Sequence, residues 1–223
     1  MGDWTKLKAR DGFEFDAYVA RPLLTPTAAL VVLHEIFGVN SHIRAVTDSY
    51  AAEGYLAIAP ALFDRAKPGF EAGYLAADVA AGRDIATALD RAATLMDIEA
   101  AVQFALAFGR VGLVGYCWGG TMAYASATSV GGLSAVSGYY GGGIAAMKEA
   151  TPKVPTILHF GTRDAHIPMS DVEALKAAQP SVTIHVYDAD HGFNCDQRGS
   201  YNKPSADLAR SRSFAFFKRH LAA

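Results

Sequence analysis

Six short apolar runs, separated by longer stretches with helical spacing, constrain the fold of this chain more than any other feature of its sequence. The runs cover residues 30–33, 55–59, 111–115, 133–137, 156–160 and 182–187. Because their apolar residues are consecutive rather than alternating, the runs are typical of strands that are buried on both faces. Strands that alternate with helices form βαβ units, so the pattern predicts an α/β fold with a mostly parallel, doubly wound sheet flanked by helices.

The stretches between and after the runs carry the helical part of this prediction. We expect helices over residues 41–53, 121–128, 170–178 and 205–221, and over 85–108 with a break left open. Ser170 precedes Glu173 in the spacing of a capping box, which predicts that Ser170 begins its helix. Residues 4–20 alternate around Asp11-Gly12, which predicts an N-terminal β-hairpin.

The length and composition favour one globular domain over residues 1–223. The chain is 51% hydrophobic, carries a net charge of −2 and contains two cysteines. The weak charge disfavours a nucleic-acid partner, and the longest apolar runs are too short to span a membrane. Two cysteines and an N-terminus without an apolar leader favour a cytoplasmic protein. We expect a small-molecule substrate and a monomer or weak homo-oligomer.

Ligands in such sheets bind at the carboxyl ends of the strands, so the residues directly after each run are the candidates for a site. Four strand ends carry reactive or charged side chains. They are His34-Glu35-Ile36-Phe37-Gly38, Gly115-Tyr116-Cys117-Trp118-Gly119-Gly120, Gly161-Thr162-Arg163-Asp164 and Asp188-Ala189-Asp190-His191-Gly192-Phe193.

The second of these segments has the form of a nucleophile elbow, Gly-x-Ser-x-Gly, with Cys117 in place of the serine. An apolar run precedes it and an alanine-rich helical stretch follows it, which is the context that the motif requires. The start of that helix would favour a thiolate through its partial positive charge. The alternative is a small buried cysteine between packing glycines.

A nucleophile needs a base, and the base needs a group that orients it. Asp164 and His191 follow Cys117 in the order nucleophile, acid, histidine, which is the order found in α/β-hydrolases. His191 would pair with the Cys117 sulfur while Asp164 holds the ring. Taken singly, a helix-capping aspartate and a surface histidine remain open as alternatives.

The tetrahedral oxyanion of acyl transfer needs backbone donors, and two are expected near Cys117. The N–H of Trp118 directly follows the nucleophile, and the N–H of Ile36 follows an earlier strand. Glu35 stands out because a carboxylate that faces a catalytic pocket requires a reason. A surface or helix-capping glutamate is the alternative.

These four segments resemble those of the dienelactone hydrolase family, and the resemblance runs from about residue 30 to the C-terminal helix. It implies an α/β-hydrolase fold and the opening of cyclic enol-lactones, as in the degradation of aromatic compounds. The catalytic triad would be Cys117, His191 and Asp164, acting through a thioester acyl-enzyme. Glu35 matches a glutamate that holds the resting thiol neutral and deprotonates it once substrate is bound.

The substrate-binding residues are less closely determined by the resemblance. Members of the family bind the substrate carboxylate with arginines, one of them four residues after the catalytic histidine, where this chain has Cys195. Arg83 and Arg198 are the candidates to replace it. Phe37 and Tyr139 are candidate pocket residues, with aromatic core packing as the alternative for Tyr139.

Other functional classes can also be weighed from the sequence. No metal site is expected, because the chain has no H-E-x-x-H motif and because no second pair completes a site with His191 and Cys195. The chain has no C-x-x-C motif, which disfavours thioredoxin-like redox chemistry. No cofactor is expected, since no glycine-rich phosphate loop follows a strand. A redox sensor built on Cys117, and a binding protein that keeps the fold without turnover, remain open as alternatives to the hydrolase.

Overall fold

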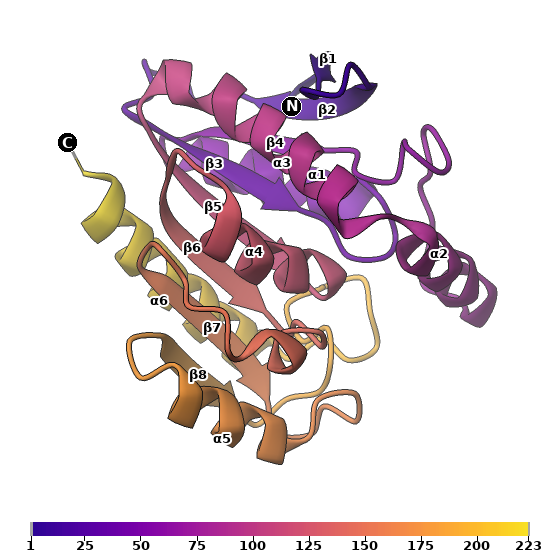
Figure 1. The fold of residues 1–223 in the computed structure, drawn as a ribbon, viewed down its shortest axis with the longest axis vertical. Helices are drawn as coiled ribbons and strands as arrows, with labels where there is room; N and C mark the ends of the chain where they lie inside the picture. Colours follow the sequence, from indigo (N-terminus) through magenta and orange to yellow (C-terminus); the bar gives the residue numbers. More distant parts are fainter. Residues whose placement is uncertain (1, 223) are drawn as a thin grey trace.

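A computed structural model describes residues 2–222 as one eight-stranded sheet with helices on both faces (Figure 1). The strand order is β1-β2-β4-β3-β5-β6-β7-β8, and β3 to β8 are parallel to one another. In the described part of the chain, no helix combines the length and apolarity needed to cross a membrane. The strands are β1 (Asp3–Lys8), β2 (Glu14–Ala20), β3 (Ala28–Leu33), β4 (Leu56–Pro60), β5 (Arg110–Tyr116), β6 (Leu133–Tyr139), β7 (Thr156–Gly161) and β8 (Thr183–Tyr187).

The helices follow the strands in the alternation that the sequence predicts. They are α1 (Ser41–Ala52), α2 (Ala76–Ala88), α3 (Arg91–Ala105), α4 (Trp118–Ser129), α5 (Met169–Ala178) and α6 (Lys203–Leu221), with short 3₁₀ turns η1 (Leu106–Phe108) and η2 (Ala145–Met147). The prediction of a mostly parallel α/β sheet is therefore confirmed.

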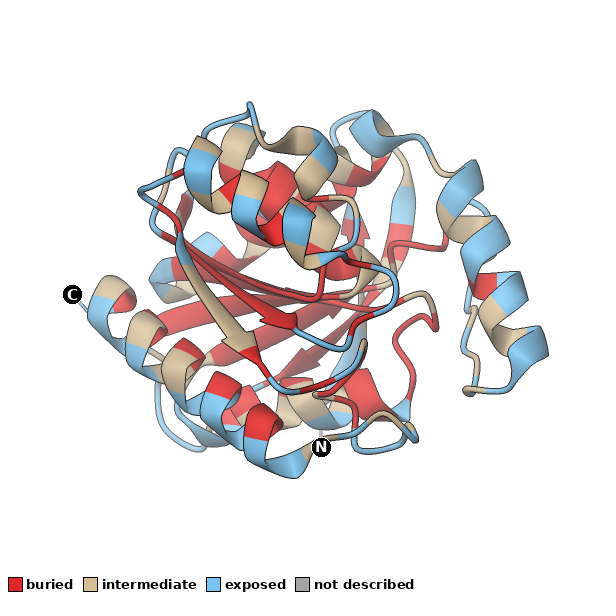
Figure 2. Cartoon of the chain, turned by 90° about the horizontal axis from the view of Figure 1, so that it is seen from below, coloured by how far each residue is buried: buried red, intermediate tan, exposed pale blue. Residues whose placement is uncertain are grey.

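The central strands are buried on both faces, as their unbroken apolar runs predict. In β3, Leu30 and Val32 pack in one cluster with side chains of α1 and α6. Val31 and Leu33 point the other way and pack with side chains of α3 and α4. Figure 2 shows the result as buried strands between helices whose outer surfaces are exposed. Burying both faces gives the sheet enough apolar contact to hold its carboxyl edge rigid.

The predicted N-terminal hairpin is present as β1 and β2, which pair antiparallel from Asp3–Val19 to Lys8–Glu14. Gly12 takes a positive φ of 89° in the turn, and Asp11 accepts a hydrogen bond from the N–H of Phe13. This Asx-type turn explains why the Asp-Gly pair marks the reversal of the chain. The hairpin joins the sheet through β4, again antiparallel.

The helical stretch predicted over residues 85–108, with a break left open, is broken: it holds the end of α2, then α3 and η1. Asp90 separates α2 from α3, and its side chain accepts a hydrogen bond from the N–H of Ala92 at the start of α3. The helix α2 begins at Ala76, well before the predicted start. Its first turns are mostly exposed alanines, so they have no apolar stripe from which a helix could be predicted. In Figure 2 this helix, at the right edge, is mostly exposed, with some intermediate residues and one buried residue.

The capping-box prediction for Ser170 is wrong. The helix α5 begins at Met169, with Pro168 as its N-cap and no side-chain cap hydrogen bond. Pro168 has extended backbone angles, and its carbonyl already accepts from the N–H of Val172. A proline fits this boundary because it has no N–H to leave unpaired. Ser170 therefore lies inside the first turn.

The parallel register brings the four segments identified in the sequence to one edge of the sheet. Leu33 at the end of β3 is paired with Gly115 of β5, and Tyr116 is paired with Tyr139 at the end of β6. Gly161, at the end of β7, is paired with Tyr187 at the end of β8. Chain segments that are far apart in the sequence therefore leave the sheet side by side.

Candidate active site

Cys117 lies on a strained turn between β5 and α4. Its φ of 55° is in the left-handed region, which a residue with a Cβ adopts at a cost of about 1–3 kcal/mol. Two backbone hydrogen bonds hold the turn: the N–H of Cys117 donates to Tyr139, and its carbonyl accepts from Thr121. The side chain is partly exposed. This geometry is that of a nucleophile elbow, which presents a side chain at the edge of the sheet.

The turn also requires Gly119 to have no side chain. A Cβ at Gly119 would lie 2.5 Å from the carbonyl oxygens of both Leu33 and His34. Both are backbone atoms and cannot move aside without disturbing β3. The first turn of α4 therefore packs directly against the segment that leads from β3 to Ile36.

This packing brings together the two loops whose backbone N–H groups were predicted to bind an oxyanion. Trp118 is the first residue of α4, where the helix has no acceptor for its N–H groups. Ile36 lies two residues beyond His34, on the segment against which α4 packs. The indole of Trp118 also stacks on the imidazole of His34, with ring centroids 5.6 Å apart. The two candidate donors thus come from neighbouring loops.

His191 connects Cys117 to Asp164. Its Nε2 lies 3.1 Å from the Cys117 Sγ, and its Nδ1 lies 2.7 Å from Oδ2 of Asp164. The other carboxylate oxygen of Asp164 accepts from the N–H of His166, so both oxygens are used. The Asp164 side chain is fully buried and that of His191 is largely buried. The three side chains form the chain nucleophile–imidazole–carboxylate that acyl-transfer enzymes use.

The environment of His191 favours the imidazolium. Burial by itself would lower the pKa of His191, but the hydrogen bonds to Asp164 and Cys117 outweigh it and raise the pKa to about 10. A buried carboxylate that accepts from Nδ1 stabilises positive charge on the ring. At neutral pH the ring therefore holds the proton that a leaving oxygen requires.

Replacing Asp164 with asparagine is expected to lower the pKa of His191 from about 10 toward the ordinary value of 6.5. An amide cannot offset the charge of an imidazolium, so below the new pKa the ring is cationic and above it neutral. NMR titration of the His191 ring protons measures the change. Asp190→Asn is the matched control, since it removes the same charge from the exposed neighbour of His191. Equal pKa values in both variants would contradict the role of Asp164.

Glu35 is buried directly after β3 and is paired with Arg198 rather than with Cys117. The Nη1 of Arg198 donates to Oε1 of Glu35 over 3.2 Å, and the Glu35 side chain is only 2% exposed. The guanidinium also lies over the ring of Phe37, 5.5 Å from its centroid. A Cβ at Gly192, which has a φ of 77°, would lie 2.3 Å from Arg198 Nη1. The glycine after His191 therefore makes room for this arginine.

Tyr139, one of the predicted substrate-binding residues, lies elsewhere. It is buried in the core, where its hydroxyl is hydrogen-bonded to Ser213 of α6 and its ring stacks on His159. The core-packing alternative therefore describes Tyr139.

The two candidate arginines lie on different elements. Arg83 is exposed on α2 and follows Gly82, where a Cβ would collide with the backbone carbonyl of Ile36, so this part of α2 packs against the Ile36 segment. Arg198 is the one that is paired with Glu35.

Tyr140 is the tyrosine that faces His191, with ring centroids 5.2 Å apart. It is the second non-glycine residue with a positive φ in the described chain, beside Cys117. Its buried hydroxyl has no hydrogen-bond partner among the described residues. Burial raises the pKa of Tyr140 well above its ordinary value, so the hydroxyl keeps its proton. Its position directly after β6, at the carboxyl edge of the sheet, is the feature of the sequence that marks Tyr140 as a candidate site residue.

Tyr74 and Cys195 complete the surroundings of Arg198. The Cys195 thiol is fully buried and lies 3.2 Å from the Tyr74 hydroxyl. Burial raises the pKa of Cys195 to about 11, which keeps the thiol neutral. The Tyr74 ring packs edge-on against Phe37. Tyr74 was not identified from the sequence because it lies in a loop far from any strand end.

A hollow of about 1020 Å³ lies at the opposite edge of the sheet, where the parallel strands begin. It is bounded by residues 20–28 and by the ends of α1 and α6. Ala28 begins β3, whereas the elbow follows the end of β5, and these two strands are parallel. The hollow is therefore separate from Cys117, His191 and Asp164.

Comparisons with known proteins identify the family of this chain. The family model described as "Dienelactone hydrolase family" matches residues 15–221. A putative carboxymethylenebutenolidase of Synechocystis sp. is 38% identical over 92% of this chain and 91% of its own length. The carboxymethylenebutenolidase of Pseudomonas putida is 32% identical over 94% of this chain and 93% of its own length.

A solved structure extends the agreement to the fold. The crystal structure of a putative dienelactone hydrolase from Klebsiella pneumoniae superposes with a TM-score of 0.83. The two chains are 29% identical, and the match covers 97% of this chain and 98% of the other. The expected α/β-hydrolase fold is therefore confirmed. The chain belongs to the dienelactone hydrolase family and is a hydrolase that acts on ester bonds.

Proposed function

We propose that this protein opens a small, carboxylate-bearing lactone or enol ester through a thioester on Cys117. The observation that carries the proposal is His191, which lies within hydrogen-bond distance of both the Cys117 sulfur and the Asp164 carboxylate. A redox sensor would need a reactive thiol but no oriented imidazole. The chain of three side chains therefore favours acyl transfer over oxidant sensing.

The proposed reaction begins with attack of the Cys117 thiolate on the lactone carbonyl. The N–H groups of Ile36 and Trp118 bind the oxyanion of the tetrahedral intermediate, which can contribute about 3–4 kcal/mol per donor. The C–O bond of the ring then breaks and leaves a thioester. The imidazolium of His191 gives its Nε2 proton to the leaving oxygen, which departs as the enol or alcohol and leaves His191 neutral.

Water completes the cycle. Neutral His191 takes a proton from a water molecule, and the resulting hydroxide attacks the thioester carbonyl. Collapse of this second tetrahedral intermediate releases the carboxylic acid and restores the Cys117 thiolate. An enolate is a good leaving group, whereas a simple alkoxide is not. We therefore expect enol-lactones and enol esters to be turned over well and alkyl esters poorly.

Arg198 is the proposed ligand for the substrate carboxylate. Its guanidinium is half-buried between Glu35 and the ring of Phe37, close to the other groups of the site. The names of the relatives denote a butenolide, a lactone, with a carboxymethylene group. A carboxylate bound to Arg198 would compete with Glu35 for the guanidinium. Glu35, once released, is the proposed base that deprotonates a resting Cys117 thiol.

Replacing Arg198 with glutamine is expected to raise KM for a carboxylate-bearing lactone by about 10- to 100-fold, since one charge-assisted hydrogen-bonding partner is lost. An uncharged enol ester should be affected far less, and steady-state kinetics on both substrates separates binding from general damage. Arg219→Gln is the matched control because Arg219 is exposed in the last turn of α6, which lies beside the start of β5 rather than its end. An equal loss on both substrates, or an equal loss in Arg219→Gln, would argue against Arg198 as the carboxylate ligand.

The proposed function as a whole is tested by mass spectrometry of the intact protein mixed with a panel of lactones and enol esters. A thioester adds the mass of the acyl group, and peptide mapping locates it on Cys117. Rapid acid quenching is needed, because the adduct is expected to be hydrolysed within a turnover. Turnover with no adduct on Cys117 under any quench condition would overturn the thioester route.

A further inference from the structure

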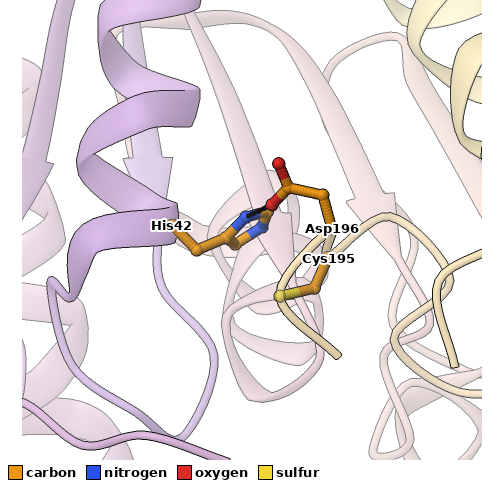
Figure 3. Close-up of side chains that lie close together, drawn as sticks. All are labelled: His42, Cys195 and Asp196. Carbon is orange, nitrogen blue, oxygen red and sulfur yellow. Dashed lines mark hydrogen bonds and ion pairs between the residues drawn. The ribbon is translucent and has the colours of Figure 1, made fainter. Parts of the chain in front are cut away.

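An imidazole, a thiol and a carboxylate meet at a point that the proposed reaction does not use. They belong to His42, Cys195 and Asp196 (Figure 3). His42 lies in the first turn of α1, whereas Cys195 and Asp196 lie in the loop between β8 and α6. One potential ligand atom from each lies within 4.8 Å of the others. Within residues 2–222 this is the one group of three such side chains with that spacing.

The fold leaves His42 with one ring nitrogen unused. The side chain is only 3% exposed, and its Nδ1 is 3.0 Å from Oδ1 of Asp196. Its Nε2 is buried and has no hydrogen-bond partner among the described residues. Buried polar atoms in native proteins are nearly always paired, with a bound ion or water as a common partner. Figure 3 shows this imidazole reaching from α1 to the Cys195–Asp196 segment.

The donor set matches one class of metal ion. Nitrogen, sulfur and carboxylate oxygen together are typical ligands of zinc, whereas calcium and magnesium prefer oxygen ligands throughout. In a tetrahedral zinc site the ligand atoms are separated by about 3.3–3.8 Å, given zinc–ligand bonds of about 2.0–2.3 Å. The three ligand atoms, which lie within 4.8 Å of one another, therefore need side-chain movements of about 1 Å to enclose an ion.

Two of the three proposed ligands line a cavity, whereas the Cys195 sulfur is buried behind them. His42 and Asp196 line a small cavity of about 190 Å³ together with Asn194 and residues of α6. The Asp196 side chain is 66% exposed, so the carboxylate marks the outer side of the site. Asp207 and Arg210 of α6 also line this cavity, so their opposite charges offset each other near the entrance. A cavity of this size has room for water as a fourth ligand.

We propose that His42, Cys195 and Asp196 form a zinc-binding site. The ion is held by Nε2 of His42, the Cys195 sulfur and a carboxylate oxygen of Asp196, with water in the fourth position. Because Asp196 faces Nδ1 in the structure, this coordination requires the His42 ring to turn about its Cβ–Cγ bond. The thiol proton is released to solvent when the sulfur binds, and the imidazole keeps its single proton on the other nitrogen. No oxidation or reduction is involved.

Zinc at this position would also act on the neighbouring active site. Cys195 is hydrogen-bonded to Tyr74, which packs against Phe37, the residue beneath Arg198. Binding of the sulfur to zinc removes the thiol proton and ends its donation to Tyr74. Arg198 lies three residues after Cys195 on the same loop. Zinc is therefore expected to reduce turnover of carboxylate-bearing substrates.

The test is a titration of the purified, chelator-treated protein with Co²⁺, a spectroscopic substitute for zinc. We expect one equivalent to produce a thiolate-to-cobalt charge-transfer band that zinc abolishes by competition. His42→Gln should weaken binding at least about tenfold, as should Asp196→Asn, which keeps a similar shape at an exposed position. At the same zinc concentration, zinc should raise the Tm of the wild-type protein more than that of His42→Gln.

Cys117→Ser separates this site from the active site, where a thiol and an imidazole also meet. The band should persist in Cys117→Ser and disappear in Cys195→Ser. The reverse pattern, or cobalt binding that is unaffected in both His42→Gln and Asp196→Asn, would overturn the proposal. If His42→Gln does not fold, Asp196→Asn decides the outcome alone. Binding is read without substrate, so the result is independent of whether the thioester route is correct.

Discussion

Cys117→Ala is expected to lower kcat/KM on an enol-lactone by about 10⁴-fold or more, which is the scale of loss when a covalent nucleophile is removed. The sulfur lies 3.1 Å from the only ring nitrogen of His191 that is free of Asp164. Alanine leaves this imidazole with nothing to activate except water. The proposed oxyanion donors, the N–H groups of Ile36 and Trp118, remain, so a small residual rate over the uncatalysed reaction is expected.

The matched control for this variant is the second cysteine. Cys195 is fully buried, and its thiol is bonded to Tyr74 rather than to a histidine that an aspartate orients. Cys195→Ser should therefore still form an acyl adduct, whereas Cys117→Ala should form none. Steady-state kinetics and intact mass are measured on both variants after circular dichroism has shown that they are folded. Turnover by Cys117→Ala at a rate near that of wild type would refute the assignment of Cys117 as the nucleophile.

Gly119→Ala is expected to reduce the free energy of unfolding by about 3–5 kcal/mol, at the upper end of single-residue effects. The new methyl group would lie 2.5 Å from two backbone carbonyl oxygens, those of Leu33 and His34. Relieving the contact means moving α4 away from β3, which separates Trp118 from the loop of Ile36. Activity should therefore fall even under conditions where the variant remains folded.

Gly131→Ala is the control for the stability measurement. Gly131 lies just beyond α4, and a Cβ there meets no atom within 4 Å. Urea unfolding should give a free energy within about 1 kcal/mol of wild type, because alanine mainly restricts the unfolded chain. If Gly119→Ala proved as stable as Gly131→Ala, the claim that α4 packs too closely on β3 to admit a side chain at Gly119 would be wrong.

The strand pattern was predictable because it depends on local sequence and burial. Consecutive apolar residues such as Leu30, Val31 and Val32 are typical of a strand whose two faces are both buried. The strand β3 is buried in this way. The helices were predictable where an apolar stripe marks the buried face, as in α1 and α6. The early start of α2 was missed because its exposed alanines carry no such stripe.

The positions of Cys117, Asp164 and His191 could also be inferred from the sequence. Each follows a strand, and parallel strands end at the same edge of a sheet, so order along the chain predicts proximity. The distances between their atoms could not be inferred in this way. Which tyrosine faces His191 depends on the backbone at the end of β6, where Tyr140 takes a left-handed conformation and Tyr139 turns into the core.

The sequence by itself determined the fold class, the elbow and the order of the reactive residues, because these follow from local hydrophobic patterning and from motif spacing. Only the tertiary structure decided which distant side chains meet. The pair Glu35–Arg198 and the group of His42 with Cys195 and Asp196 each join residues more than 150 positions apart. Such contacts depend on how a loop packs across the sheet edge, and no local pattern encodes that packing.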